Sequence, residues 1–176
     1  LPGVANGLAY GIYLCAGILT WGLFAEIIGR CQSVFLEHAN LLKKLSFPRI
    51  CLPLVVVLNA LVNFAIIFAL FLGFLLVTNN FPGWAVFGVL PVLAIQVLFA
   101  VGLGIILGVL NVFFRDVGQL TGIVLQFWFW FTPIVYPLSI LPEAVAPWLA
   151  YNPMAPLIQA YQGIFVQGLW PDWQGL

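Results

Sequence analysis

Hydrophobic and polar positions along this chain are arranged in long blocks. Four blocks are apolar over the roughly 20 residues that a membrane-spanning helix needs, at a rise of about 1.5 Å per residue. They cover residues 7–28, 50–77, 84–114 and 117–137. Polar or turn-forming residues separate them, as in the segment TNNFPGW that starts at Thr78. The pattern predicts an all-α, polytopic membrane helix bundle with about four full spans.

Residues 138–176 follow a different pattern. Prolines at positions 142, 147, 153, 156 and 171 interrupt them, and they contain no apolar run long enough to span a membrane. We expect short broken helices here, one from Pro142 to Ala150 and a second from about Met154 to Phe165, with a break at Asn152-Pro153. Irregular backbone at membrane depth must be covered by protein or must line a cavity.

Composition supports the membrane assignment. The chain is 64% hydrophobic and only 6% charged, against roughly 25% charged residues in a soluble domain, and its mean hydropathy is +1.17. The net charge of zero says nothing about the kind of binding partner, and we expect no nucleic-acid partner. Cys15, Cys31 and Cys51 are odd in number and widely spaced, so we interpret them as buried small hydrophobic residues. The chain begins with Leu1 and shows no signal peptide, so we treat it as a fragment.

The basic residues predict the orientation in the membrane. All five lie between the first and second spans or between the third and fourth: Arg30, Lys43, Lys44, Arg49 and Arg115. The opposite segments, 78–83 and 138–176, contain no Lys or Arg and carry only Glu143 and Asp172. By the positive-inside rule, residues 30–49 and 115–116 are cytoplasmic, and 78–83 and 138–176 are external or in the outer leaflet.

The first basic segment has helical periodicity. From Val34 onward the apolar positions share one face, whereas Glu37, Asn40, Lys43 and Lys44 fall on the other. This predicts a short amphipathic helix over residues 33–45, which Ser46-Phe47-Pro48 then breaks. A simple topology anchor is the alternative. Periodicity does not distinguish a helix that rests on lipid from one that docks on protein.

Four motifs occur in order along the chain. They are NLLKKLSFPR at 40–49, GLGIILGVLNVFFRDV at 102–117, FWFWFTPIVYPLSILP at 127–142 and NPMAPLIQAYQ at 152–162. In this order and spacing the chain resembles the ABC-2 type exporter permeases, and most of all those that export O-antigen, capsular polysaccharide or teichoic acid. The resemblance implies that residues 1–176 form a single ABC-2 transmembrane domain. It also implies that an interface helix and one span precede this fragment and that a final span follows it.

The resemblance implies a function and partners. The chain would be the permease subunit of an ATP-binding cassette exporter that moves a lipid-linked polysaccharide across the bacterial cytoplasmic (inner) membrane, working as a homodimer among membrane lipids. We find no Gly-rich phosphate loop, so we expect no cofactor in this chain and no enzyme activity; a separate ATPase subunit would bind ATP and Mg. The resemblance assigns a coupling helix that docks on this ATPase to Phe35, Glu37, His38, Asn40, Leu41, Leu42, Lys43, Lys44, Phe47, Pro48 and Arg49.

The aromatic run at the end of the fourth block is the candidate glycan channel. Sugars have apolar faces that stack on aromatic rings, although an interfacial aromatic belt is an equal alternative. The candidate channel residues are Phe127, Trp128, Trp130, Phe131 and Tyr136. We expect Phe127, Trp130 and Phe131 to share one helix face, with Trp128 about 100° away. By resemblance, an outer gate follows at Pro142, Trp148, Tyr151, Asn152 and Pro153.

Isolated polar residues inside the spans have structural interpretations. Uncharged groups at membrane depth most often form hydrogen bonds between helices rather than contact substrate; here they are Asn59, Asn63, Gln96, Asn111 and Gln126. Glu26 lies about one turn from Arg30, so we expect an ion pair. Arg115-Asp116 should close a tight turn. His38 stands alone, so we assign it neither catalysis nor metal binding.

Three other functions remain in competition. One is an ABC-2 exporter of a drug or small lipid. Another is an integral-membrane glycan-processing enzyme, which the shortage of acidic residues on the outer side disfavours. A third is a purely structural or assembly protein. Association with an ATPase would count against the last.

Overall fold

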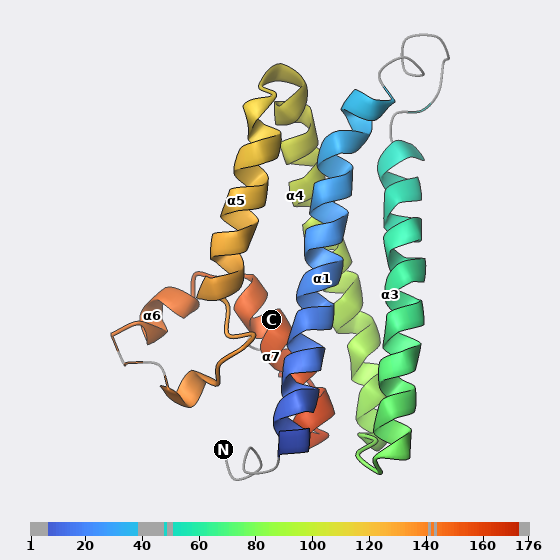
Figure 1. Cartoon of the computed structure of the whole chain (residues 1–176), viewed down its shortest axis with the longest axis vertical. Coiled ribbons are helices and arrows are strands. Elements are labelled where there is room, and N and C mark those ends of the chain that lie inside the picture. The colour runs from blue at the N-terminus through green and yellow to red at the C-terminus, as the bar shows by residue number, and fades with distance from the viewer. Residues whose placement is uncertain (1–6, 39–47, 49–50, 141, 143, 173–176) are drawn as a thin grey trace.

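The computed structural model describes residues 7–38, 48, 51–140, 142 and 144–172, and these residues contain helices and turns but no strand. Figure 1 shows the long helices running side by side. In chain order the elements are α1 (Gly7–Glu37), α3 (Cys51–Val77), η1 (Gly83–Gly88), α4 (Val89–Phe113), α5 (Asp116–Phe131), η2 (Leu138–Ile140), α6 (Ala146–Leu149), α7 (Met154–Gln162) and the π-helical turn η3 (Gly163–Gln167).

Three of these helical stretches are long and apolar enough to cross a membrane: Gly7–Glu37, Cys51–Val77 and Gly83–Phe113. The predictions for residues 50–77 and 84–114 are thereby confirmed almost to the residue. Successive helices alternate in direction, and α1 lies among the others, where it packs against α3, α4, α5, α7 and η3 (Figure 1). The molecule is a multi-pass membrane protein.

The fourth predicted span ends early. We expected it to reach Pro137, but α5 stops at Phe131 after 16 residues, about 24 Å, whereas the hydrocarbon core is about 30 Å thick. Thr132 is extended, with φ −98° and ψ 137°. It precedes Pro133, and the residue before a proline disfavours the helical conformation. The chain therefore leaves the helix within the depth that the longer helices cover (Figure 1).

The first span continues further than expected. We placed its end near Ile28 and a separate amphipathic helix from residue 33, but α1 runs through Glu37, and the His38 N–H still bonds to the Val34 carbonyl at 3.1 Å. The only weak point between the two predicted helices is Gly29, and a single glycine costs a helix only about 1 kcal/mol. Residues 33–37 are thus the last turns of α1. The remainder of the predicted helix, 39–45, lies outside the described residues.

Small residues bring α4 close to α1. The buried positions of α4 recur every three or four residues and include Ala100, Gly104 and Gly108. A Cβ built on Gly108 would lie 2.8 Å from the Cys31 carbonyl oxygen. Such close backbone approach is characteristic of helix pairs in membranes. Cys31 is buried as predicted, but the prediction fails for Cys15, which is exposed, and Cys51 is only partly buried.

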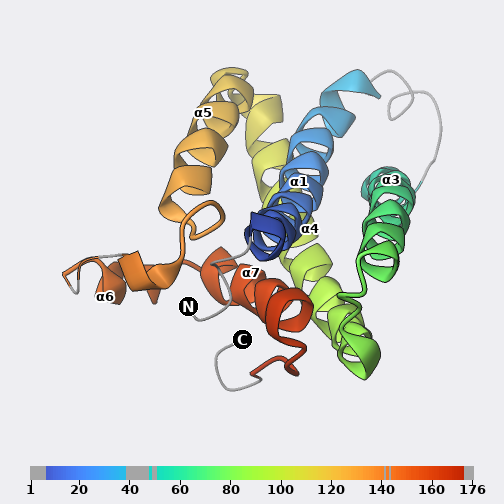
Figure 2. The same cartoon turned by 60° about the horizontal axis from the view of Figure 1, so that its bottom comes forward.

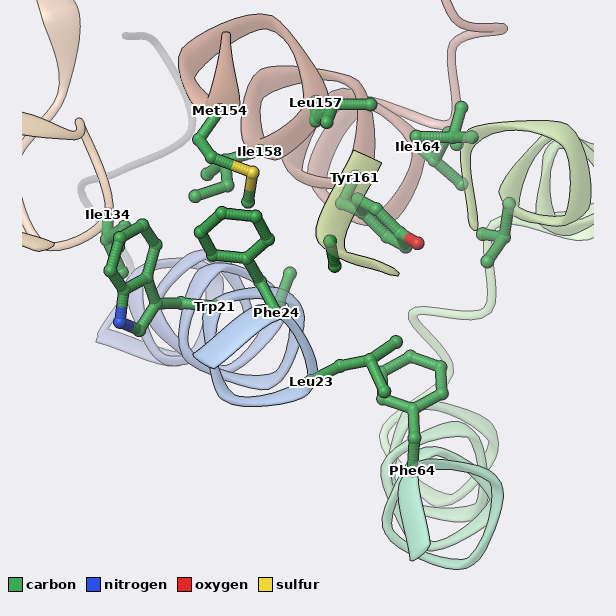
Figure 3. Close-up of a cluster of buried hydrophobic side chains, with 14 of the residues drawn as sticks. Trp21, Leu23, Phe24, Phe64, Ile134, Met154, Leu157, Ile158, Tyr161 and Ile164 are labelled. Carbon is green, nitrogen blue, oxygen red and sulfur yellow. The ribbon is translucent and has the colours of Figure 1, made fainter. Parts of the chain in front are cut away.

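The proline-rich segment returns to the bundle through α7. Figure 2 shows α7 lying across α1 near the start of that helix, with α6 displaced to one side. The inward face of α7 carries Met154, Leu157, Ile158 and Tyr161, at the i, i+3, i+4, i+7 spacing of an amphipathic helix. Figure 3 shows Met154 and Ile158 pointing toward Phe24 of α1. The predicted second short helix is confirmed; its π-helical extension ends at Gly168, whose φ is +65°.

Two sets of contacts show which segments share an end of the bundle. At one end the Asn111 side chain donates a hydrogen bond to the Gln32 carbonyl at 3.2 Å and accepts one from Gly118 N–H at 3.0 Å. These bonds join the end of α1 to the α4–α5 turn, so Arg30 and Arg115 fall in the same half of the bundle. At the other end, a Cβ on Gly88 would lie 2.8 Å from Pro171 Cδ, which places η1 beside the C-terminal segment.

Candidate functional site: an aromatic groove at a helix break

A groove of about 690 Å³ lies between the second half of α5 and the segment that carries α6. Most of its wall is aromatic or aliphatic. No Asp, Glu, Lys or Arg is among the described residues that line it: Val124, Phe127, Trp128, Phe131, Tyr136, Val145, Trp148, Leu149, Tyr151, Asn152 and Pro153. The described lining can therefore contact an uncharged ligand through ring faces.

Trp128 forms the inner wall of this groove. Its ring packs edge-on against Trp21, with centroids 6.1 Å apart, and against Phe24 at 5.4 Å. Its indole Nε1–H donates a hydrogen bond to Asn152 Oδ1 at 2.8 Å. Trp128 is thus held from α1 on one side and from the α6–α7 junction on the other.

Asn152 connects the groove wall to the end of α5. Its Oδ1 also accepts a hydrogen bond from Met154 N–H at 3.1 Å, and its Nδ2 donates to Thr132 Oγ1 at 3.0 Å. The Thr132 hydroxyl in turn donates to the Trp128 carbonyl at 2.8 Å. Asparagine is suited to such a chain reversal because its carboxamide both donates and accepts and readily bonds backbone groups two residues on.

The break after α5 leaves carbonyl groups without helical partners, and such groups need other donors inside a bilayer because water is absent there. Side chains from α1 and α7 supply the donors. The Tyr10 hydroxyl donates to the Val135 carbonyl at 2.9 Å, and the Tyr13 hydroxyl donates to the Tyr136 carbonyl at 3.0 Å. Gln162 Nε2 donates to the Pro133 carbonyl at 3.3 Å. These bonds stabilise a non-helical turn beside the groove.

Four of the five predicted channel residues line the groove. Phe127, Phe131 and Tyr136 do so with Trp128, but Trp130 does not. Trp130 lies on another face of α5, 60% exposed, and its ring packs edge-on against Phe129 at 5.6 Å. Trp130 is therefore not part of the described wall, because the position of α6 decides which sector of α5 lines the groove.

The predicted gate residues are also largely assembled here. Trp148, Tyr151, Asn152 and Pro153 line the groove, whereas Pro142 is exposed and is not among the lining residues. The helix expected over 142–150 is shorter, because α6 covers only Ala146–Leu149. Sequence reasoning missed Tyr10, Tyr13 and Gln162 as supports, because a hydroxyl or amide in a helix does not reveal which distant carbonyl it bonds.

The polar residues inside the spans mostly join helices, as expected. Gln96 Nε2 donates to the Thr20 carbonyl at 2.7 Å, and Asn63 Nδ2 donates to Glu26 Oε2 at 3.1 Å. Glu26 also pairs with Arg30 at 2.9 Å, which confirms the predicted ion pair. Gln126 is exposed, and Asn59 lines a cleft of about 540 Å³ between α1 and α3.

The predicted coupling residues are only partly described. Phe35 and Glu37 belong to the end of α1, His38 follows them, and Pro48 is exposed. The others lie outside the described residues: Asn40, Leu41, Leu42, Lys43, Lys44, Phe47 and Arg49. The Arg115-Asp116 turn is confirmed, since Val117 N–H bonds to the Phe114 carbonyl at 3.0 Å as α5 begins.

Comparison with known proteins gives a family and relatives. The model of the ABC-2 type transporter family matches residues 2–166. An O-antigen export system permease protein of Myxococcus xanthus is 34% identical over 165 residues, covering 93% of this chain and 64% of that protein. One from Klebsiella pneumoniae is 31% identical over 161 residues, covering 91% and 62%. The chain thus spans less than two thirds of the length of these relatives.

Proposed function

The chain belongs to the ABC-2 type transporter family, and we propose that it forms most of the permease subunit of an exporter for a lipid-linked polysaccharide in the bacterial cytoplasmic membrane. The aromatic groove is the observation that carries this proposal. It joins rings of α5 to rings of the broken segment in one uncharged wall. The similarity to O-antigen export permeases supports the choice of substrate class.

Ring stacking suits a polymer that must move. A stacked aromatic pair contributes only about 0.5–1.5 kcal/mol beyond its area burial, so each sugar unit would be held weakly. The wall offers several such rings in succession, among them Phe131, which is 69% exposed, and Tyr151, which is 85% exposed. A glycan can exchange one ring for the next without a large barrier, as continuous transport requires.

The groove is open on the side of these exposed rings, and we propose that a second copy of the permease closes it. Most oligomers of identical chains are symmetric. A twofold arrangement that places the two grooves opposite one another would convert two one-sided walls into an enclosed path. The substrate would then be shielded from lipid along its length.

A conformational change driven by ATP hydrolysis would reach the groove through α1. We propose that residues 30–49 and 115–116 are cytoplasmic and that the segment after α1 contacts a separate ATPase subunit, which binds ATP and Mg. Helix α1 runs without interruption from Gly7 to Glu37 and carries Trp21 and Phe24, which pack on Trp128. A displacement at its cytoplasmic end would therefore reach the groove wall through direct packing.

Loss of the full-length permease tests this function. Cells without it should accumulate the lipid-linked polymer on the cytoplasmic side of the inner membrane, and the wild-type gene should restore the polymer to the surface. Surface polymer at normal levels in the deletion strain would overturn the proposal. Normal polymer together with defective efflux of a single amphiphile would instead favour a drug or small-lipid exporter.

A further inference from the structure

The polar groups at the base of the aromatic groove are satisfied by one another. Trp128 Nε1–H bonds to Asn152 Oδ1 at 2.8 Å, and Asn152 Nδ2 bonds to Thr132 Oγ1 at 3.0 Å. The Tyr136 hydroxyl donates to the Trp130 carbonyl at 2.9 Å. In this arrangement the groove presents ring faces to a ligand, while these donors and acceptors are turned inward.

Asn152 occupies the junction between a docked segment and an undocked one. After it, α7 packs on α1, and Figure 3 shows the buried side chains that the two helices share. Before it, α6 lies away from the bundle (Figures 1 and 2). A swing of α6 about this junction would stretch the bonds that Asn152 makes to Trp128 and Thr132.

We propose that Asn152 is a positioning residue that acts through Trp128 as a latch on the groove, an inference that rests on the proposed transport function. The latch is closed when the Asn152 carboxamide bonds to the indole. It opens when hydroxyl groups of the glycan take over those bonds. Asn152 thereby sets both the orientation of the Trp128 ring and the distance between α5 and the α6 segment.

The exchange conserves hydrogen bonds. A sugar hydroxyl accepts from the Trp128 N–H through its oxygen and donates its own hydrogen to Asn152 Oδ1, so every group keeps a partner. An acyl chain has no such groups, and opening the latch around it would leave the Trp128 N–H unpaired in an apolar site, while Asn152 Oδ1 would keep only the Met154 N–H as a donor among the described residues. A site built on hydrogen bonds strongly rejects a ligand that lacks them. The latch therefore selects hydroxylated polymer over apolar amphiphiles.

The indole N–H of Trp128 reports the latch directly. We would label the tryptophans of the full-length permease with ¹⁵N, place it in lipid nanodiscs, and assign the Trp128 signal by its loss in Trp128→Phe. Asn152→Leu should shift this signal and speed exchange of the indole proton with water about fivefold, the equivalent of one neutral hydrogen bond. Asn152→Asp retains an acceptor oxygen for the indole and should keep the indole proton protected from exchange.

Two matched variants separate the latch from general disturbance. Gln126→Ala changes an exposed amide two residues before Trp128 and should not move the indole signal. Thr132→Val removes the hydroxyl that accepts from Asn152 Nδ2 and should move the signal less than Asn152→Leu does. An unchanged Trp128 signal in Asn152→Leu, or the same shift in all three variants, would overturn the proposal.

Export measurements then test the consequence. Asn152→Leu should change polymer export severalfold in the wild-type background but add little in Trp128→Phe, because both changes break the same bond. Independent, multiplicative effects would show that Asn152 does not act through Trp128. The indole measurement needs no transport. If Asn152→Leu shifts the Trp128 signal as expected but the wild-type permease exports no glycan, the proposed function is refuted and the hydrogen-bond assignment stands.

Discussion

Gly104 of α4 lies so close to Cys31 of α1 that a Cβ on Gly104 would sit 2.7 Å from the Cβ of Cys31. Gly104→Ala should therefore push α1 and α4 apart and destabilise the bundle by about 1–3 kcal/mol, the usual cost of overpacking. The measurement is the thermal unfolding midpoint of the purified permease in detergent.

The same helix supplies the control for this prediction. Gly102 lies two residues earlier on α4, and a Cβ there would meet nothing within 4 Å. Gly102→Ala should be neutral or stabilise by up to about 1 kcal/mol, because alanine has the higher helix propensity. Equal midpoints for the two variants would contradict the tight α1–α4 contact.

The support of the helix break gives a second prediction. Tyr13→Phe removes the hydroxyl that donates to the Tyr136 carbonyl, and Gln162→Leu removes the amide that donates to the Pro133 carbonyl. The first change leaves the Tyr136 carbonyl without this donor, and the second leaves the Pro133 carbonyl with only the Tyr13 hydroxyl as a donor among the described residues. Each change should cost about 1–3 kcal/mol. Both should increase protease cleavage within residues 132–145. Tyr151→Phe, at an exposed hydroxyl, is the control and should be cleaved like the wild type.

Membrane orientation gives a third prediction. In a full-length permease lacking Cys15, Cys31 and Cys51, single cysteines at 79 and 143 should react with an impermeant thiol reagent added to intact cells. Cysteines at 44 and 115 should react only after the cells are opened. Labelling of 44 or 115 from outside would reverse the proposed topology.

The proposed ATPase contact gives a fourth prediction. Replacing Leu41 and Leu42 with Asp places charge on the apolar face of the predicted helix, so it should abolish export while the protein still inserts. Ser46→Asp adds charge beyond that helix and should leave export largely intact. Co-purification of the ATPase subunit is measured for each variant. Unchanged export and unchanged association in the double variant would refute a coupling role for residues 33–45.

Sequence periodicity predicted the long helices well. A continuous apolar run that spans a membrane is expected to be helical, because it must satisfy its own backbone hydrogen bonds. The prediction therefore matched α3 to within one residue. It failed at the ends of α1 and α5, where local signals compete: Gly29 was too weak to stop α1, and the extended Thr132 before Pro133 stopped α5 six residues before the predicted end.

The candidate site was predictable in part. Helical geometry alone places Phe127 and Phe131 on one face, and both line the groove. Trp130 lies within reach of that face on a helical wheel, and only the position of α6 excludes it. That position depends on contacts between segments far apart in sequence, such as Trp128 with Asn152 and Tyr10 with Val135. Periodicity carries no information about such pairs.

The most direct test of the central claim is a crosslink between the groove and its ligand. The photoreactive residue benzoylphenylalanine replaces Phe131, which lines the groove, or Trp130, which is similarly exposed on another face of α5. After illumination of polymer-exporting cells, an antibody against the polysaccharide detects glycan joined to the permease. We predict a glycan-bearing permease with the label at 131 and little or none at 130. Crosslinking at 130 alone, or equally at both positions, would contradict the aromatic groove as the path of the polysaccharide.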